Sequence, residues 1–209
     1  MLADIAVREY LGRLASNAPA PGGGSAAALA GALAAALGEM VGNFTVGKKK
    51  FAGVEEDIKR LLAVLEEQRG VLLALTDEDA SAYGQVAQAY AMPRSTNEEK
   101  AARADAIQKA LKAACEVPFG VCRCCAAVIG TLRELAQKGN PNLISDVGCA
   151  AKLALAALEC AWLNVEINLA SIKDAKFVEG RRDELEQIMA PCADEVSEVW
   201  RLVVETIRS

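Results

Sequence analysis

One carboxylate interrupts an apolar pattern that is typical of a buried helix face. Apolar residues recur there at seven-residue intervals, at Ile58, Leu65, Leu72 and Val86. Asp79 occupies the position in this series between Leu72 and Val86, whereas Asp77 and Glu78 fall off it and are expected to face water. Burial would raise the pKa of Asp79 towards the range in which a carboxyl group transfers protons. The alternative is that the series ends near Leu75 and that Asp79 is a solvated surface residue.

The second candidate is the segment Pro21–Ser25, which contains Gly22, Gly23 and Gly24. Glycines leave backbone N–H groups accessible, and Ser25 is expected to be the N-cap of the helix that follows. The positive end of this helix would suit an anion or the carbonyl oxygens of a ligand. No lysine follows the glycines, so the segment is not a phosphate-binding P-loop. A plain turn with an N-cap is the other interpretation.

Two amides lie one helical turn apart in a mostly apolar segment, at Asn164 and Asn168. Such a pair could orient a heterocycle by donating and accepting hydrogen bonds. Hydrogen bonds to neighbouring helices or to water are the alternative, which the pattern alone favours.

A basic cluster, Lys48, Lys49 and Lys50, follows the glycine-containing helix and could hold carboxylates of an anionic substrate. The alternative is a solvated helix end, which is the usual role of a short run of lysines.

The residue inventory narrows the chemistry further. The chain has no histidine, which excludes histidine triads and Cys/His zinc sites, so acid–base work falls to carboxylates, Lys, Tyr, Cys or the substrate. The net charge of −5 argues against nucleic acid as a partner.

The cluster Cys122, Cys124 and Cys125 has no second pair that would complete a metal site, so we expect buried thiols. The odd count of seven cysteines indicates reduced thiols and a cytoplasmic protein.

The elements that must position these residues are predicted to be helices. Hydrophobic residues make up 53% of the chain but aromatic residues only 4%, because much of the apolar content is alanine, the strongest helix former. A capping-box pattern at Thr96 and Glu99 marks one helix start, and a kink or break is expected at Pro118. Helices are predicted over about 5–15, 25–46, 54–91, 96–138, 144–175 and 181–207. The 209 residues thus suit one all-α domain, 1–209, an elongated up-and-down bundle of about five to six helices.

The alanine-rich segment Ala26–Val46 is long enough to cross a membrane. Glu39 lies within it and no second clean span follows, so we expect no membrane contact. Small residues recur four apart on this helix, in the pairs Ala27/Gly31 and Gly38/Gly42. They predict burial in a bundle or at a subunit interface.

Taken in order, these segments resemble the cyclodeaminase half of formiminotransferase-cyclodeaminase and the free-standing bacterial cyclodeaminase/cyclohydrolase proteins. The resemblance extends over nearly the whole chain. It is carried by Pro19–Gly31, Lys48–Phe51, Asp77–Tyr83, Met92–Arg94, Asn97–Lys100, Gly139–Asn140, Ser145–Asp146 and Asn164–Leu169. It implies an all-helical homodimer without metal or organic cofactor, and a folate substrate that often carries a polyglutamate tail.

The family catalyses two related reactions. In one, N10 of 5-formimidoyltetrahydrofolate attacks the formimidoyl carbon and ammonia leaves. In the other, water attacks 5,10-methenyltetrahydrofolate and opens the ring to 10-formyltetrahydrofolate. Both pass through a tetrahedral carbon between two nitrogens, and both need one group that moves a proton. A catalytically silent helical dimer that binds folate or a partner protein is the alternative.

The resemblance also implies roles for individual residues. Asp79 matches the family's Asp-Ala-x-Ala-Phe/Tyr pattern and is the expected proton carrier, with Asp77 in reserve. Lys48 to Lys50 would face the glutamate tail. The pterin and the reacting carbon would be held by Gly22, Gly23, Gly24, Ser25, Asp146, Asn164 and Asn168.

Overall fold

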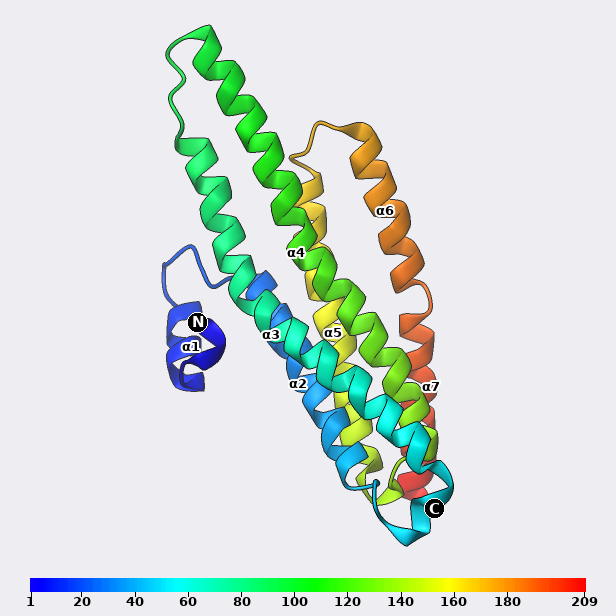
Figure 1. The fold of residues 1–209 in the computed structure, drawn as a ribbon. Coiled ribbons are helices and arrows are strands. Elements are labelled where there is room, and N and C mark those ends of the chain that lie inside the picture. Colours follow the sequence, from blue (N-terminus) through cyan, green and yellow to red (C-terminus); the bar gives the residue numbers. More distant parts are fainter.

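The protein is an elongated bundle of α-helices without strands (Figure 1), and the computed structural model describes residues 1–209. The helices are α1 (Val7–Leu14), α2 (Gly23–Asn43), α3 (Glu55–Ala91), α4 (Asn97–Lys138), α5 (Ile144–Leu169), α6 (Ala175–Met189) and α7 (Cys192–Arg208). Short 3-10 helices lie at η1 (Leu2–Asp4), η2 (Lys49–Val54) and η3 (Pro141–Leu143). The predicted all-α class is confirmed.

Two helix predictions need correction. The segment expected to form one helix over 181–207 is two helices, α6 and α7, which meet at Pro191. Proline has no backbone N–H to continue the ladder, so it ends a helix that is otherwise well patterned. In contrast, α4 continues through Pro118 without a break. Pro118 is buried, and packing around it offsets the hydrogen bond that proline cannot make.

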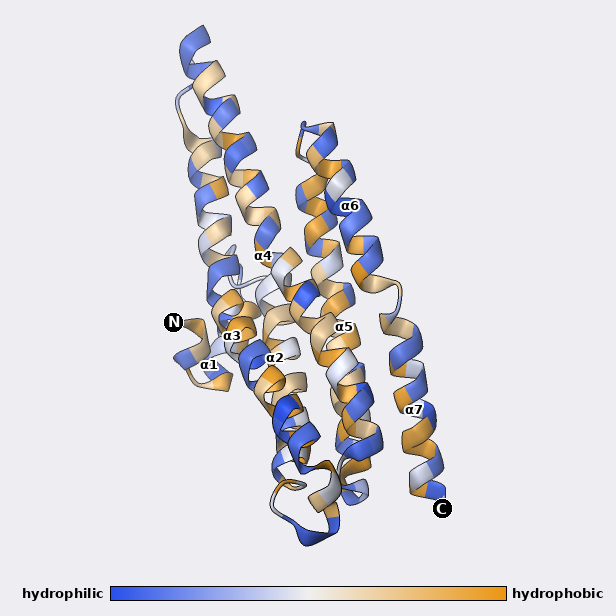
Figure 2. Cartoon of the chain, turned by 45° about the vertical axis from the view of Figure 1, so that its right-hand side comes forward, coloured by the Kyte–Doolittle hydropathy of each residue, from blue (hydrophilic) through white to orange (hydrophobic).

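The long helices α3 and α4 form a hairpin that projects beyond the rest of the bundle, while α2 and α5 lie side by side within it (Figure 1). The hairpin turn is fixed by the predicted capping box: Thr96 accepts from the backbone of Glu99, whose side chain accepts from the backbone of Thr96. Figure 2 shows many hydrophilic residues on the projecting end and hydrophobic ones where the helices pack. The buried core of 40 residues draws on helices α2 to α7.

The small residues of α2 let its neighbours approach closely within one chain. A Cβ atom at Gly31 would lie 2.9 Å from Cys125 Sγ, and one at Gly38 would lie 2.9 Å from side-chain atoms of Leu65 and Leu132. These glycines therefore pack α2 against α3 and α4, which is the first of the two roles that the small-residue spacing predicted.

The one charged residue of the apolar helix α2 is paired. Glu39 on α2 accepts a hydrogen bond of 2.5 Å from Arg69 Nε on α3. Two helices, Gly23–Asn43 and Asn97–Lys138, are long and apolar enough to cross a membrane. More than half of each apolar window is buried in the bundle, at 56% and 61%, as in the core helices of soluble proteins.

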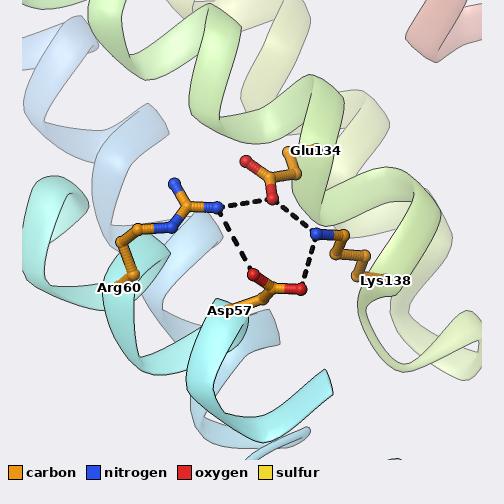
Figure 3. A network of polar contacts seen from close by, with 4 residues as sticks. All are labelled: Asp57, Arg60, Glu134 and Lys138. Carbon is orange, nitrogen blue, oxygen red and sulfur yellow. Dashed lines mark hydrogen bonds and ion pairs between the residues drawn. The ribbon is translucent and has the colours of Figure 1, made fainter. Parts of the chain in front are cut away.

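A second set of ion pairs joins the start of α3 to the end of α4 (Figure 3). Arg60 donates to Glu134 at 2.5 Å, and Lys138 Nζ lies 2.6 Å from Asp57 Oδ2. These side chains are partly exposed, so solvent and salt screen the pairs and each contributes little to stability. The network links α3 to α4 at the end of the bundle that contains Lys48 to Lys50.

Candidate active site

One cavity of about 320 Å³ lies where the start of α2, the second half of α3 and the end of α5 meet. It is lined by Pro19, Ala20, Gly22, Gly23, Gly24, Asp79, Ala82, Tyr83, Val86, Tyr90, Leu111, Ala114, Asn164, Ile167, Asn168 and Ser171. The structure therefore brings together the three glycines, the carboxylate and both amides that the sequence analysis selected. Asp79 is the only charged residue in this lining.

Asp79 faces the cavity, as the seven-residue series predicts, and not the solvent. Its Oδ2 atom accepts a hydrogen bond of 3.0 Å from the backbone N–H of Ser25, in the first turn of α2. Burial raises the pKa of Asp79, and the hydrogen bond from Ser25 opposes this rise by stabilising the charged form. A carboxyl group whose pKa is raised is better suited to accept and return a proton than an ordinary surface carboxylate.

The start of α2 differs from the prediction in one respect. The N-cap is Gly22 and not Ser25, because the helix begins at Gly23. No side chain of the segment caps this helix, and the carboxylate of Asp79 instead accepts one of its free N–H groups. A sequence pattern cannot show that a carboxylate 54 residues away takes over the capping role.

Ser25 lies behind the cavity wall and is completely buried. Its Oγ atom donates to the carbonyl oxygen of Thr76 at 2.9 Å and lies 3.0 Å from the hydroxyl of Tyr10. The hydroxyl is thus engaged by the protein and is not part of the cavity lining. Ser25 meets the site through its backbone N–H.

The two amides each use one N–H within their own helix. Asn164 Nδ2 donates to the carbonyl of Cys160, and Asn168 Nδ2 donates to the carbonyl of Asn164, both at 2.8 Å. Each amide keeps its oxygen and its second N–H for a ligand. A Cβ atom at Gly23 would lie 3.5 Å from Asn164 Nδ2, so this amide packs directly against the start of α2.

Four of the predicted site residues lie elsewhere in the chain: Lys48, Lys49, Lys50 and Asp146. Lys50 lines a separate hollow of about 570 Å³. Asp146 is in the first turn of α5, 18 positions before Asn164, or about 27 Å along a helix. A single chain therefore does not bring these four residues to the cavity.

Asp77 is not the solvated residue that the sequence pattern predicts. One of its carboxylate oxygens accepts a hydrogen bond from the backbone N–H of Leu2, and the other is buried without a partner. Asp77 is outside the cavity lining. Its contact holds the N-terminal segment against α3.

Tyr83 and Tyr90 were not identified as site residues from the sequence. Both line the cavity, and about half of each side chain is exposed. Their positions, one and three helical turns beyond Asp79, are the signal that could have identified them. Their rings form an aromatic wall that suits a flat conjugated ligand.

The cysteines form no site. Cys115, Cys122, Cys124 and Cys125 are buried, and burial raises the pKa of Cys122 to about 12. These thiols are protonated at neutral pH and pack as small apolar groups, as predicted.

The all-helical bundle thus contains a cavity lined by one half-buried carboxylate, two amides and two tyrosine rings, which is a lining suited to a small flat ligand. Residues 6–187 match the family described as formiminotransferase-cyclodeaminase, and the chain belongs to that family.

Its relatives include complete proteins and parts of longer ones. The chain is 44% identical over 209 residues to methenyltetrahydrofolate cyclohydrolase of Methylorubrum extorquens, covering 100% of the chain and 99% of that protein. It is 34% identical over 188 residues to formimidoyltransferase-cyclodeaminase of Rattus norvegicus, covering 90% of the chain and 35% of that protein. The chain thus spans about a third of that longer relative. The solved structure of formiminotetrahydrofolate cyclodeaminase from Thermotoga maritima matches with a TM-score of 0.89 and 34% identity, covering 99% of this chain and 100% of that chain.

Proposed function

We propose that this protein is a folate enzyme that opens the methenyl bridge of 5,10-methenyltetrahydrofolate with water, giving 10-formyltetrahydrofolate. The observation that carries the proposal is the single half-buried carboxylate, Asp79, which lines a cavity beside two amides. The 44% identity over the full length of a methenyltetrahydrofolate cyclohydrolase supports this choice of reaction.

Asp79 supplies the proton transfers of the reaction. It accepts a proton as water adds to the methenyl carbon, and a tetrahedral carbon forms between N5 and N10. When that carbon collapses, the C–N5 bond breaks, the hydroxyl oxygen becomes the formyl oxygen on N10, and N5 takes up a proton. One proton is released overall. A carboxyl group with a raised pKa is suited to both directions of transfer.

Other residues of the cavity hold the substrate. The oxygens of Asn164 and Asn168 accept hydrogen bonds from N–H groups of the pterin, and the rings of Tyr83 and Tyr90 pack against its flat faces. Gly22, Gly23 and Gly24 let the reacting carbon approach the start of α2, since no side chain intervenes.

Cyclodeamination of 5-formimidoyltetrahydrofolate is the second candidate, supported by the name and the TM-score of 0.89 of the Thermotoga maritima structure. Here N10 attacks the carbon of the protonated formimidoyl group, and Asp79 moves the N10 proton to the departing NH2 group, which leaves as ammonia and gives the methenyl cation. The same carboxylate and the same tetrahedral carbon serve both reactions.

The decisive experiment offers purified protein each substrate and follows methenyltetrahydrofolate by its absorbance. Accelerated loss of the methenyl compound indicates the hydrolase, and its accumulation from the formimidoyl compound indicates the deaminase. Folate binding without turnover of either substrate would instead favour a silent folate-binding protein. The Asp79→Asn variant is the control for contaminating activity.

A homodimer is part of the proposal. Leu33, Leu163 and Ile167 are 54%, 60% and 69% exposed on the adjacent helices α2 and α5. A groove of about 310 Å³ between these helices is lined mostly by alanine and shares Gly23 and Asn164 with the cavity. A second copy seated on this apolar face would cover the groove and close one side of the site.

The dimer also gives the lysines a role. Helix α2 runs from the cavity towards Lys48, over 21 residues or about 31 Å. A two-fold axis that sets the α2 helices of two copies antiparallel would bring the lysines of one copy towards the cavity of the other. Lys48, Lys49 and Lys50 would then bind the carboxylates of a polyglutamate tail. A cytoplasmic location is also proposed, and the seven free cysteines support it.

A further inference from the structure

Helix α1 buries a single residue, and that residue is polar at its tip. Tyr10 is 3% exposed, whereas Val7 and Leu11 of the same helix are 75% and 54% exposed. Hydrophobic packing therefore holds α1 weakly. The buried tyrosine carries most of its contact with the rest of the protein.

The direction of the hydrogen bonds around Tyr10 can be assigned. The carbonyl oxygen of Thr76 can only accept, so the one hydroxyl proton of Ser25 is used in the 2.9 Å bond to Thr76. The hydroxyl of Tyr10, 3.0 Å from Ser25 Oγ, must then be the donor. A directed chain runs from Tyr10 through Ser25 to α3.

Ser25 is also the residue whose backbone N–H donates to Asp79 at 3.0 Å. Rotation or displacement of Ser25 would therefore change the orientation of the carboxylate in the cavity. Two hydrogen bonds hold the hydroxyl of Ser25, and only the one from Tyr10 comes from outside helices α2 and α3.

The N-terminal arm, residues 1–22, meets the site at further points. The backbone N–H of Leu2 donates to Asp77, two residues before Asp79 on α3. Pro19 and Ala20, at the other end of the arm, line the cavity. The arm is thus docked beside Asp79 and forms part of the cavity wall.

We propose that Tyr10 is a positioning residue for the reaction: its hydroxyl holds Ser25 in place, and Ser25 in turn orients the carboxylate of Asp79. The inference rests on the proposed acid–base role of Asp79. It gives the arm a catalytic purpose that a simple N-terminal extension would not have.

The test is Tyr10→Phe, which keeps the ring and removes only the hydroxyl. With 5,10-methenyltetrahydrofolate as substrate, we expect kcat to fall about tenfold while KM changes by less than about twofold, because the loss concerns the orientation of the reacting group. The basic form of Asp79 would also lose support from Ser25, so the acid limb of the kcat–pH profile moves to higher pH. Val7→Ala, on the exposed side of the same helix, is the matched control and should behave as wild type.

A double variant separates positioning from general damage. In an Asp79→Asn background, Tyr10→Phe should cause little further loss, because the group that it orients is already inactive. Circular dichroism checks that each variant is folded. A folded Tyr10→Phe protein with normal kcat and an unmoved pH profile would overturn the proposal, as would an equal further loss in the Asp79→Asn background.

The outcomes also distinguish this proposal from the proposed function. If wild-type protein turns over neither folate, or if Asp79→Asn is as active as wild type, the proposed function fails. If Asp79→Asn is inactive and Tyr10→Phe is normal, only the role of Tyr10 fails.

Discussion

Gly24 and Asp79 are so close that no side chain fits between them. A Cβ atom at position 24 would lie 2.1 Å from Asp79 Oδ1 and 2.7 Å from its Cγ, far inside any real contact. Glycine is required here because the carboxylate presses against the helix start, and not because of an unusual backbone angle. This contact sets the position of the Asp79 carboxylate.

Gly24→Ala should therefore displace Asp79 and lower kcat by about a hundredfold, the scale expected for loss of an acid–base group. Steady-state kinetics with the methenyl substrate checks this. Gly84→Ala on α3, where a Cβ atom would meet nothing within 4 Å, is the matched control. It should keep its activity and gain up to about 1 kcal/mol in stability, because alanine favours a helix over glycine. Equal activity of the two variants would show that the contact is unimportant.

Asp79→Asn should lower kcat by about a hundredfold or more and change KM little, since the loss lies in the transition state. The pH profile of kcat should lose its carboxylate limb. Asp77→Asn should keep most of the activity, because the amide oxygen can still accept the hydrogen bond from Leu2 and position 77 does not line the cavity. An inactive Asp77→Asn beside an active Asp79→Asn would reverse the two assignments.

The Asp79→Asn substitution should also change the free energy of unfolding in a pH-dependent way. Burial raises the pKa of Asp79 in the folded protein, so folding favours the protonated form. The stabilising contribution of this group is present at pH values below its unfolded pKa and is lost as the pH rises through the folded pKa. Asp79→Asn should therefore be more stable than wild type at pH 7, and the difference should vanish near pH 3. Thermal melting at both pH values checks this; a difference that grows on acidification would contradict it.

Tyr83→Ala should raise the KM for folate about fivefold, because an aromatic contact of this kind contributes about 1 kcal/mol. Tyr83→Phe keeps the ring and should keep KM near its wild-type value. If both variants have the same KM for folate, the ring of Tyr83 does not pack against the substrate. Tyr90 should show the same pattern.

Leu163→Glu places a charge on the apolar face of α5 and should convert the expected dimer into monomers at low micromolar concentration. Sedimentation velocity measures this directly. Glu substitution at Val7, which is 75% exposed and lies on α1, should leave the dimer intact. Wild-type protein that sediments only as a monomer would remove the dimer from the proposal.

Reversing the charge of Lys48, Lys49 and Lys50 together should raise KM most for folates with long tails. Each exposed lysine–carboxylate contact contributes about 1 kcal/mol or less, and added salt should reduce the effect by screening. Equal effects on mono- and polyglutamyl substrates would separate the lysines from the tail.

The sequence was informative where a local pattern decides the structure. The seven-residue series placed Asp79 on the inner face of α3, and the capping box at Thr96 fixed the start of α4. Prediction from the sequence failed where a residue far along the chain takes part in the local structure. The helix begins at Gly23, so Ser25 is not the N-cap, and its N–H is taken by Asp79, a residue far along the chain.

The contact of Tyr10 with Ser25 could not be predicted from the sequence either, since one tyrosine in a short helix gives no periodic signal. The partners of such residues are chosen by tertiary packing, which spacing along the chain does not encode.

Because the carboxylate of Asp79 already occupies the positive end of α2, this helix start is not a free cradle for an anion. The carboxylate instead favours a ligand that carries positive charge at the reacting carbon. The methenyl bridge is such a cation, whereas the formyl group of the product is neutral. The cavity would therefore hold its substrate by an attraction that disappears when the ring opens, and the reaction itself would promote the departure of the product.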